Sequence, residues 1–96
     1  MAVFASIHLT ITDSDKLVEY RKLAGPAVQQ YGGKAVSTHS APIVLEAAET
    51  PPTVMVIVEF PTLDDATGWF NDPDLAHVHA LRNEAGLSTI VVNPAS

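Results

Sequence analysis

Residues 54–62 read VMVIVEFPT, a β-branched apolar run that carries one carboxylate, Glu59, close to its end. The run is too short and too β-branched for a helix, and turn residues at 50–52 precede it. We therefore predict a strand over residues 54–60, central in its sheet. Burial of an unpaired charge is costly, so Glu59 must reach water, meet a cation, hold a proton or touch a ligand.

Strand and helix patterns also alternate in the first third of the chain. Residues 3–12 alternate between apolar and polar side chains, which predicts a strand with one apolar face. Residues 13–15 can cap a helix whose apolar stripe runs to Tyr31, and residues 32–33, both glycine, can end it in a left-handed conformation. The Gly-Pro pair at 25–26 predicts a kink or two consecutive helical pieces.

Two short segments lie between this helix and the central run. Residues 34–38 predict a second strand, and residues 43–46 predict its continuation or a short neighbouring strand. After the central run, the Thr-x-x-Asp pattern at 62–65 resembles a capping box and predicts a helix.

The remaining residues predict one more helix and one more strand. Asn-Asp-Pro at 71–73 ends the previous helix and caps the next, Gly86 closes that helix, and residues 89–92 predict a last short strand. The resulting order, β-α-β-β-α-β, indicates an α+β ferredoxin-like sandwich with a four-stranded antiparallel sheet and helices on one face. No repeat or linker divides residues 1–96, so we predict a single domain.

The composition favours a homodimer. The chain has 96 residues, and 47% of them are hydrophobic, which is more apolar surface than one small core needs. The predicted fold leaves one sheet face without helices. Two such faces packed together would form a dimeric α/β barrel.

Charge and cysteine content disfavour several other classes of protein. A formal net charge of −6 with only five Lys and Arg disfavours nucleic-acid and anionic-membrane partners. The chain has no cysteine, and thus no thiolate nucleophile or thiolate metal site. The first residues lack a basic region, and no apolar run approaches the roughly 18 residues of a membrane span. We expect a cytoplasmic protein.

Several short motifs follow one another in a particular order. They are Tyr31-Gly32-Gly33-Lys34, Val44-Leu45-Glu46, Val58-Glu59-Phe60-Pro61-Thr62 with Ala66 and Trp69, and Asp72-Pro73 with Arg82. In this order they resemble the DUF1330 family of small dimeric α/β barrel proteins, over about residues 4–92. The resemblance implies that Asp13 opens the first helix, that Tyr20 is the family's tyrosine in that helix, and that Glu46 is its acidic residue after the second strand.

The sequence also departs from the family pattern. Thr38-His39-Ser40 stands where the family usually has Arg-Gly-Gly, and Ala47, Leu75 and Asn93 replace a glycine, a tyrosine and a closing glycine. Without that arginine, the cationic partners expected for Glu59 narrow to Arg82 or a ligand. The superfamily includes monooxygenases, isomerases, cyclases and non-catalytic binders, so the fold does not choose among them.

Three residues are candidates for catalysis. Glu59 and Arg82 form either a structural ion pair, the interpretation we favour, or a general base and a cation that stabilises an enolate-like anion. His8 lies on the polar face of the first strand, the face that would line the dimer barrel. It is either the best-placed general base or a histidine bonded to a neighbouring strand or to the partner chain.

Four residues are candidates for ligand binding. Tyr20 and Trp69 lie on apolar stripes, where they form either part of the core or the wall of a small-molecule cleft. His39 occupies the altered segment and is either a ligand contact or an exposed loop residue. Glu46 is included because of the family resemblance.

The two neighbouring histidines of the last helix do not indicate a metal site. His77 and His79 are two positions apart, so on a helix they point about 200° from each other, whereas chelation needs a spacing of three or four. We predict that both are surface residues, and we expect neither a metal nor another cofactor.

Together these observations predict a homodimer that binds a small apolar or aromatic metabolite in a cleft between sheet and helices. The alternative is a cofactor-independent enzyme of the isomerase, cyclase or monooxygenase type. In that alternative His8, Glu59 and Arg82 act as base, polar anchor and anion stabiliser.

Overall fold

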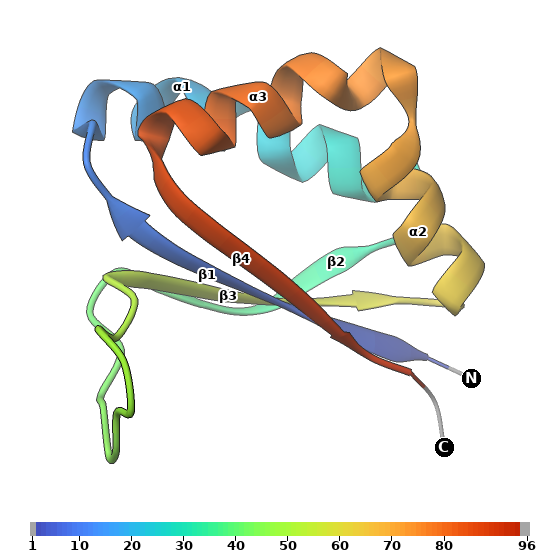
Figure 1. The fold of residues 1–96 in the computed structure, drawn as a ribbon. Helices are drawn as coiled ribbons and strands as arrows, with labels where there is room; N and C mark the ends of the chain where they lie inside the picture. The colour runs from blue at the N-terminus through green and yellow to red at the C-terminus, as the bar shows by residue number, and fades with distance from the viewer. Residues whose placement is uncertain (1, 95–96) are drawn as a thin grey trace.

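The computed structural model describes residues 2–94, which form one antiparallel sheet covered by helices on one side (Figure 1). The elements in chain order are β1 (Val3–Ile11), α1 (Ser14–Gln29), β2 (Lys34–His39), β3 (Val54–Phe60), α2 (Leu63–Asn71), the 3-10 helix η1 (Pro73–Leu75), α3 (Ala76–Ala85) and β4 (Gly86–Asn93). The strand order is β2-β3-β1-β4, and each neighbouring pair is antiparallel. The predicted ferredoxin-like α+β fold is confirmed, and the run at 54–60 is a central strand.

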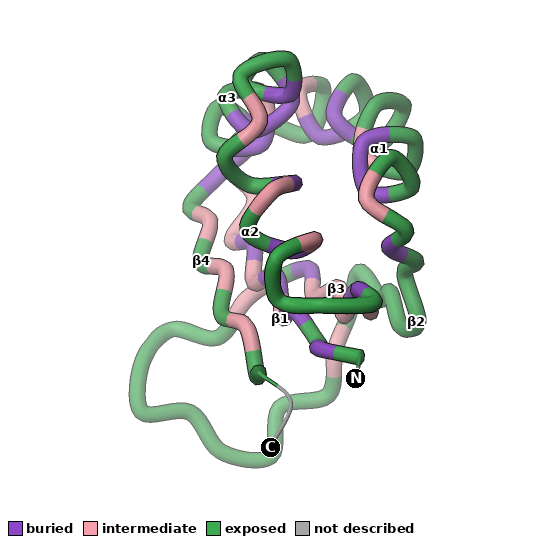
Figure 2. Tube along the Cα trace, turned by 90° about the vertical axis from the view of Figure 1, so that its right-hand side faces the viewer, coloured by how far each residue is buried: buried purple, intermediate pink, exposed green. Residues whose placement is uncertain are grey.

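The two faces of the sheet differ in burial. Along β1, Val3, Ala5, Ile7 and Leu9 are buried beneath the helices, and the residues between them point to the opposite, helix-free side. Buried positions gather where helices and sheet face each other (Figure 2). This alternation follows from the period of two in a strand, which places successive side chains on opposite faces. We call the side without helices the open face.

The predicted caps of α1 are confirmed. The Asp13 carboxylate accepts hydrogen bonds from the backbone N–H of Asp15 and of Lys16, both at 3.1 Å. At the other end Gly32 has a φ of +72°, and its N–H donates to the Gln29 carbonyl oxygen at 3.0 Å. A left-handed residue after the last turn is a common helix ending, and glycine adopts it without strain.

Of the two alternatives predicted at Gly25-Pro26, a kink or two consecutive helical pieces, the second is wrong. The helix runs unbroken from Ser14 to Gln29 with Pro26 inside it. Proline cannot donate the backbone hydrogen bond that its position would make, but its own carbonyl oxygen still accepts from Gln30 N–H at 3.2 Å. Pro26 lies in the last turn of α1, so its missing N–H removes only one backbone hydrogen bond near the end of the helix.

The caps of α2 and η1 are also confirmed. Thr62 Oγ1 accepts from the Asp65 backbone N–H at 3.1 Å, and its hydroxyl donates to the Asp65 carboxylate at 2.9 Å. Asp72 caps η1 by accepting from Asp74 N–H at 2.8 Å, and it also accepts from the Tyr31 hydroxyl at 2.6 Å. The latter hydrogen bond lowers the pKa of Asp72 and raises that of Tyr31. It joins the end of α1 to the start of η1.

Two predicted strand boundaries are wrong. Residues 43–46 form no strand but lie in the loop 40–53, which extends from the sheet on its open side (Figure 1). They cannot add to β3, whose two edges are occupied by β2 and β1, and they do not pair with the outer edge of β2 or of β4. The last strand, in turn, begins at Gly86 instead of residue 89 and extends to Asn93.

Gly86 ends α3 for a reason other than a left-handed turn. Its φ of 169° is extended backbone that any residue adopts. Space is what requires glycine here, because a β-carbon would collide with the backbone carbonyl of Thr10 on the neighbouring β1. The tight approach lets β4 pair with β1 immediately after the helix.

Candidate functional site

The three predicted catalytic residues do not meet in one site. His8 and Glu59 lie on the open face, where His8 is opposite Met55 and Glu59 is opposite Phe4 in the β1–β3 register. Arg82 is buried in α3, on the helix-covered side. The sheet therefore separates the guanidinium from the other two side chains.

The predicted Glu59–Arg82 ion pair is not formed. Glu59 Oε2 instead lies 3.3 Å from Lys34 Nζ, and the two residues are directly opposite each other on β3 and β2. The Lys34 side chain is 70% exposed, so water screens the pair and it adds little stability. Lys34 was not predicted as the partner of Glu59, because the register between two strands cannot be read from one sequence. The one available signal was that Lys34 begins a predicted strand.

The other predicted polar site residues lie away from Arg82. His8 shares a hydrogen bond of 2.6 Å with Ser6, two residues along its own strand. His39 is exposed at the end of β2 and accepts from the Ala41 backbone N–H at 3.0 Å. Glu46 is exposed in the loop 40–53. A cavity of about 340 Å³ on the open face includes His39 in its lining, but neither His8 nor Glu46.

Arg82 and His79 form a buried polar pair on α3. The Arg82 side chain is fully buried, with the residue 2% exposed; its Nε donates to Ser88 Oγ at 3.0 Å, and its Nη1 lies 2.8 Å from His79 Nδ1. A guanidinium only donates hydrogen bonds, so His79 Nδ1 must be the acceptor. The other ring nitrogen, Nε2, then carries the proton and donates to the Trp69 carbonyl oxygen at 3.0 Å.

His79 is consequently neutral. Burial lowers the pKa of His79, and the nearby positive charge of Arg82 acts in the same direction, against the opposing hydrogen bond to Trp69. The prediction that His77 and His79 are both surface residues is thus wrong for His79. Hydrogen bonds to Arg82 and to the Trp69 carbonyl, together with the Trp69 ring, take the place of water around His79. His77, pointing away from it, is exposed.

Aromatic rings surround the guanidinium. Its Cζ lies 5.8 Å from the ring centroid of Tyr20 and 5.9 Å from that of Trp69. His79 meets Trp69 edge to face, with ring centroids 4.9 Å apart. Tyr20 and Trp69 are both buried in the core, the first of the two roles predicted for them, and their predicted role as cleft walls stays a prediction. Cation–π attraction compensates part of the lost hydration of Arg82.

No carboxylate pairs with Arg82 among residues 2–94. The ion pairs formed by that part of the chain all involve lysine, at Lys16 with Glu19 and Glu84 and at Lys34 with Glu59. A buried charge is normally matched by a counter-charge, because transfer of an unpaired ion out of water is expensive. The contacts that the described residues make with the guanidinium of Arg82 come from neutral side chains, those of Ser88, His79, Tyr20 and Trp69.

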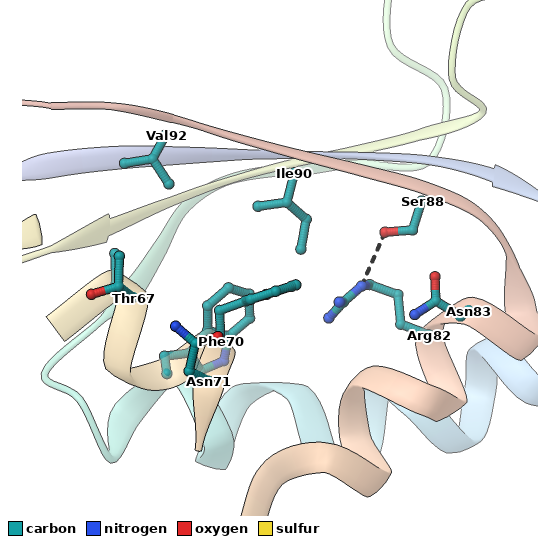
Figure 3. Close-up of a pocket in the computed structure, with 10 residues that line it drawn as sticks. Thr67, Phe70, Asn71, Arg82, Asn83, Ser88, Ile90 and Val92 are labelled. Carbon is teal, nitrogen blue, oxygen red and sulfur yellow. Dashed lines mark hydrogen bonds between the residues drawn. The ribbon is translucent and has the colours of Figure 1, made fainter. Parts of the chain in front are cut away.

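Arg82 borders a cavity of about 300 Å³ between α2, α3 and β4. In Figure 3, Ser88, Ile90 and Val92 point from β4 toward Phe70, Asn71 and Arg82 on the helices. The lining residues are Ala66, Thr67, Trp69, Phe70, Asn71, Arg82, Asn83, Ser88, Ile90 and Val92. Arg82 is the one ionisable residue among them. The indole Nε1 of Trp69 is buried and has no hydrogen-bond partner among residues 2–94. We call this space the Arg82 cavity.

A second cavity of about 390 Å³ lies between α1 and the strands β2 and β3. Its walls are mainly aliphatic and include Tyr20, and its charged residues, Arg21 and Lys34, are exposed. Its buried lining residues include the polar hydroxyl of Tyr20 but no charged side chain. We call it the α1 cavity.

Two further observations concern metals and membranes. Within residues 2–94, no group of three or more His, Asp or Glu side chains is arranged to hold a metal ion. None of the helices in the same range has the length and apolar character needed to cross a membrane.

Solved structures with the same fold are similar to almost the whole chain. A protein of unknown function from Rhodopseudomonas palustris is 16% identical, with a TM-score of 0.78 over 99% of this chain and 82% of that chain. A dimeric ferredoxin-like protein of unknown function from Jannaschia is 9% identical, with a TM-score of 0.73 over 99% and 100%. SnoaB, a cofactor-independent oxygenase from Streptomyces nogalater, is 9% identical, with a TM-score of 0.65 over 99% and 92%. These likenesses define the class of protein as ferredoxin-like.

The sequence places the chain within that class. Residues 2–94 match DUF1330, a domain of unknown function, so the chain belongs to the DUF1330 family. No curated protein matches it in sequence. The family resemblance predicted from the motifs is therefore confirmed.

Proposed function

We propose that this DUF1330 protein binds a small apolar or aromatic metabolite in the Arg82 cavity. The observation that carries the proposal is the combination of aromatic and aliphatic walls with a few buried polar groups in one concave space. Small-molecule sites generally have this composition, in which apolar walls supply affinity and a few polar groups fix orientation. The volume of about 300 Å³ suits a ligand of one or two small rings.

The same features favour the Arg82 cavity over the α1 cavity. The α1 cavity is larger, but its charged side chains are exposed and so remain satisfied by water. In the Arg82 cavity, the guanidinium is already removed from bulk water, and its Nη2 group lacks hydrogen-bond partners among residues 2–94. A ligand that supplies those partners gains free energy without a new desolvation cost for the protein.

We also propose that the protein acts as a cytoplasmic homodimer joined through the open face. Phe4, Leu87 and Val91 are exposed apolar residues on strands β1 and β4 of that face. The similar protein from Jannaschia is described as dimeric, which supports the same assembly here.

The alternative function is a cofactor-independent enzyme of the isomerase, cyclase or monooxygenase type. The likeness to SnoaB, a cofactor-independent oxygenase, favours it as the second candidate. Of the predicted catalytic residues, only Arg82 borders the Arg82 cavity, so a base other than His8 or Glu59 would be required. Binding therefore needs fewer assumptions than catalysis.

The binding proposal is tested by titrating a library of small aromatic compounds into the ¹⁵N-labelled protein. We expect shifts of the backbone amide signals of Phe70, Ser88 and Ile90. Ile90→Phe, which fills the Arg82 cavity, should weaken binding at least about tenfold. Ala24→Phe, which fills the α1 cavity instead, is the matched control and should leave binding unchanged. The proposal would be overturned if only Ala24→Phe lost binding. It would also be overturned if no compound of the library bound at millimolar concentration.

A further inference from the structure

We infer that the ligand of the Arg82 cavity carries a single carboxylate, and that the guanidinium of Arg82 binds it. The inference rests on the proposed binding function and names the class of ligand: a small monocarboxylate with an aromatic or branched apolar body. It follows from the unused donors of Arg82, from the charge of the cavity and from the arrangement of the neighbouring side chains.

Arg82 has hydrogen-bond donors that the protein does not use. Of the five N–H groups of a guanidinium, Nε–H donates to Ser88 and one Nη1–H donates to His79. The Nη2 group forms no hydrogen bond with residues 2–94, yet it is not among the buried polar atoms that lack partners. Nη2 therefore keeps a small accessible surface although the residue as a whole is only 2% exposed, and the space that Arg82 borders is the cavity. Figure 3 shows the guanidinium reaching between Ser88 and Ile90 toward that space.

The charge of the cavity favours one negative group. The chain as a whole has a net charge of −6, but none of the ten residues that line the cavity is acidic. The polar lining residues besides Arg82 are neutral: Thr67, Asn71, Asn83 and Ser88. His79, the nearest titratable neighbour, is neutral because its Nδ1 accepts from Arg82. One buried positive charge thus matches a monoanion better than a phosphate or a dicarboxylate.

The orientation of the guanidinium suits a carboxylate. Ser88 and His79 hold Nε and Nη1 from two directions, which fixes the guanidinium plane and leaves Nη2 to donate a charge-assisted N–H···O bond to a ligand oxygen. Ser88 Oγ accepts from Arg82, so its own hydroxyl proton is available to donate to a ligand oxygen. Beyond this polar end, Phe70, Ile90 and Val92 offer an apolar wall for the rest of the ligand.

The test compares each acid with its neutral isostere, and the first arm needs no variant. Pairs such as benzoate with benzamide, and 2-naphthoate with 2-naphthamide, are titrated into the unmodified protein by calorimetry or NMR. We expect the acid to bind at least about tenfold more tightly than its amide, since hydrogen bonds to a charged group are stronger than those to a neutral one. Equal affinity of acid and amide overturns the carboxylate inference but leaves the proposed binding function standing. Failure of every acid and amide to bind overturns both.

The second arm assigns the preference to Arg82. Arg82→Gln should reduce the ratio of acid to amide affinity to about one, and its folding is checked by the dispersion of its NMR spectrum. If that variant does not fold, Ser88→Ala, which removes one oriented hydroxyl and leaves the guanidinium in place, should reduce the ratio severalfold. Inorganic phosphate is the competing anion, and displacement of a bound acid by equimolar phosphate would contradict recognition of a monocarboxylate. An unchanged ratio in a folded Arg82→Gln would also contradict it.

Discussion

At the scale of single residues, neutral acceptors and aromatic faces take the place of water around the buried guanidinium of Arg82. Ser88 and His79 accept two of its N–H groups, and Tyr20 and Trp69 face its positive charge. Within residues 2–94 this arrangement uses no counter-charge. It makes the protonation state of His79 important for stability, because a protonated His79 can no longer accept from Arg82.

The lowered pKa of His79 predicts a loss of stability on acidification. Above the ordinary histidine value of 6.5, His79 is neutral in both the folded and the unfolded protein. As the pH falls below 6.5, the unfolded chain binds a proton first, so the free energy of unfolding decreases until the pH passes the folded pKa. Urea unfolding at pH 7.5 and pH 5.5 should therefore show lower stability at pH 5.5.

A pair of variants assigns this pH dependence. His79→Gln should remove a large part of the decrease, whereas His77→Gln, an exposed histidine on the same helix, should leave it unchanged. If His79→Gln keeps the full decrease and His77→Gln abolishes it, the neutral state of His79 does not stabilise the fold.

The sequence could not predict which side chains of the site contact each other. The pattern placed Arg82 and Trp69 on helices and the open-face residues on strands, but it paired Glu59 with Arg82. Side chains on opposite faces of a sheet cannot meet, and Glu59 fell opposite Lys34 through a register that single-sequence periodicity does not determine. The burial of His79 was missed because its partners, Arg82 and the Trp69 carbonyl, come together only after α2 and α3 pack.

At the scale of elements, the predictions succeeded where the deciding interaction is local. Asp13, Thr62 and Asp72 cap the helices that follow them, and each does so within one turn. The predictions failed where a distant strand decides, as at residues 43–46 and at the beginning of β4. A strand needs a partner edge, and the sequence does not show which edges are already occupied.

The start of β4 gives a prediction about Gly86. A β-carbon at this position would collide with the Thr10 carbonyl, so Gly86→Ala must push β4 away from β1 at the Ile11–Gly86 pair. We expect a loss of about 1–3 kcal/mol in the free energy of unfolding, as in other overpacked sites, measured by urea denaturation. Gly25→Ala is the control, since nothing lies within 4 Å of a β-carbon there, and it should be neutral or stabilising by up to about 1 kcal/mol. Equal stability of the two variants would contradict the steric account of Gly86.

At the scale of the whole molecule, the subunit is a two-layer slab with extents of 30 × 30 × 18 Å. Helices cover one face of the sheet, and the open face keeps Phe4, Leu87 and Val91 exposed together with the apolar residues of the loop 40–53. A small chain with this much uncovered apolar surface gains stability by burying it against a second copy. The surplus of apolar surface could be predicted from the composition, because the number of apolar residues does not depend on how the strands pair.

The proposed homodimer gives a prediction with a closely matched control. Val91, on the open face, and Val18, on the outer side of α1, are each 53% exposed. Val91→Glu would place two carboxylates in a face-to-face interface of subunits that are already acidic, so we expect it to convert the dimer to a monomer at micromolar concentration. Val18→Glu adds the same charge away from the open face and should leave the dimer intact. Light scattering after size-exclusion chromatography distinguishes the two masses. A monomeric unmodified protein, or dissociation caused by Val18→Glu but not by Val91→Glu, would contradict assembly through the open face.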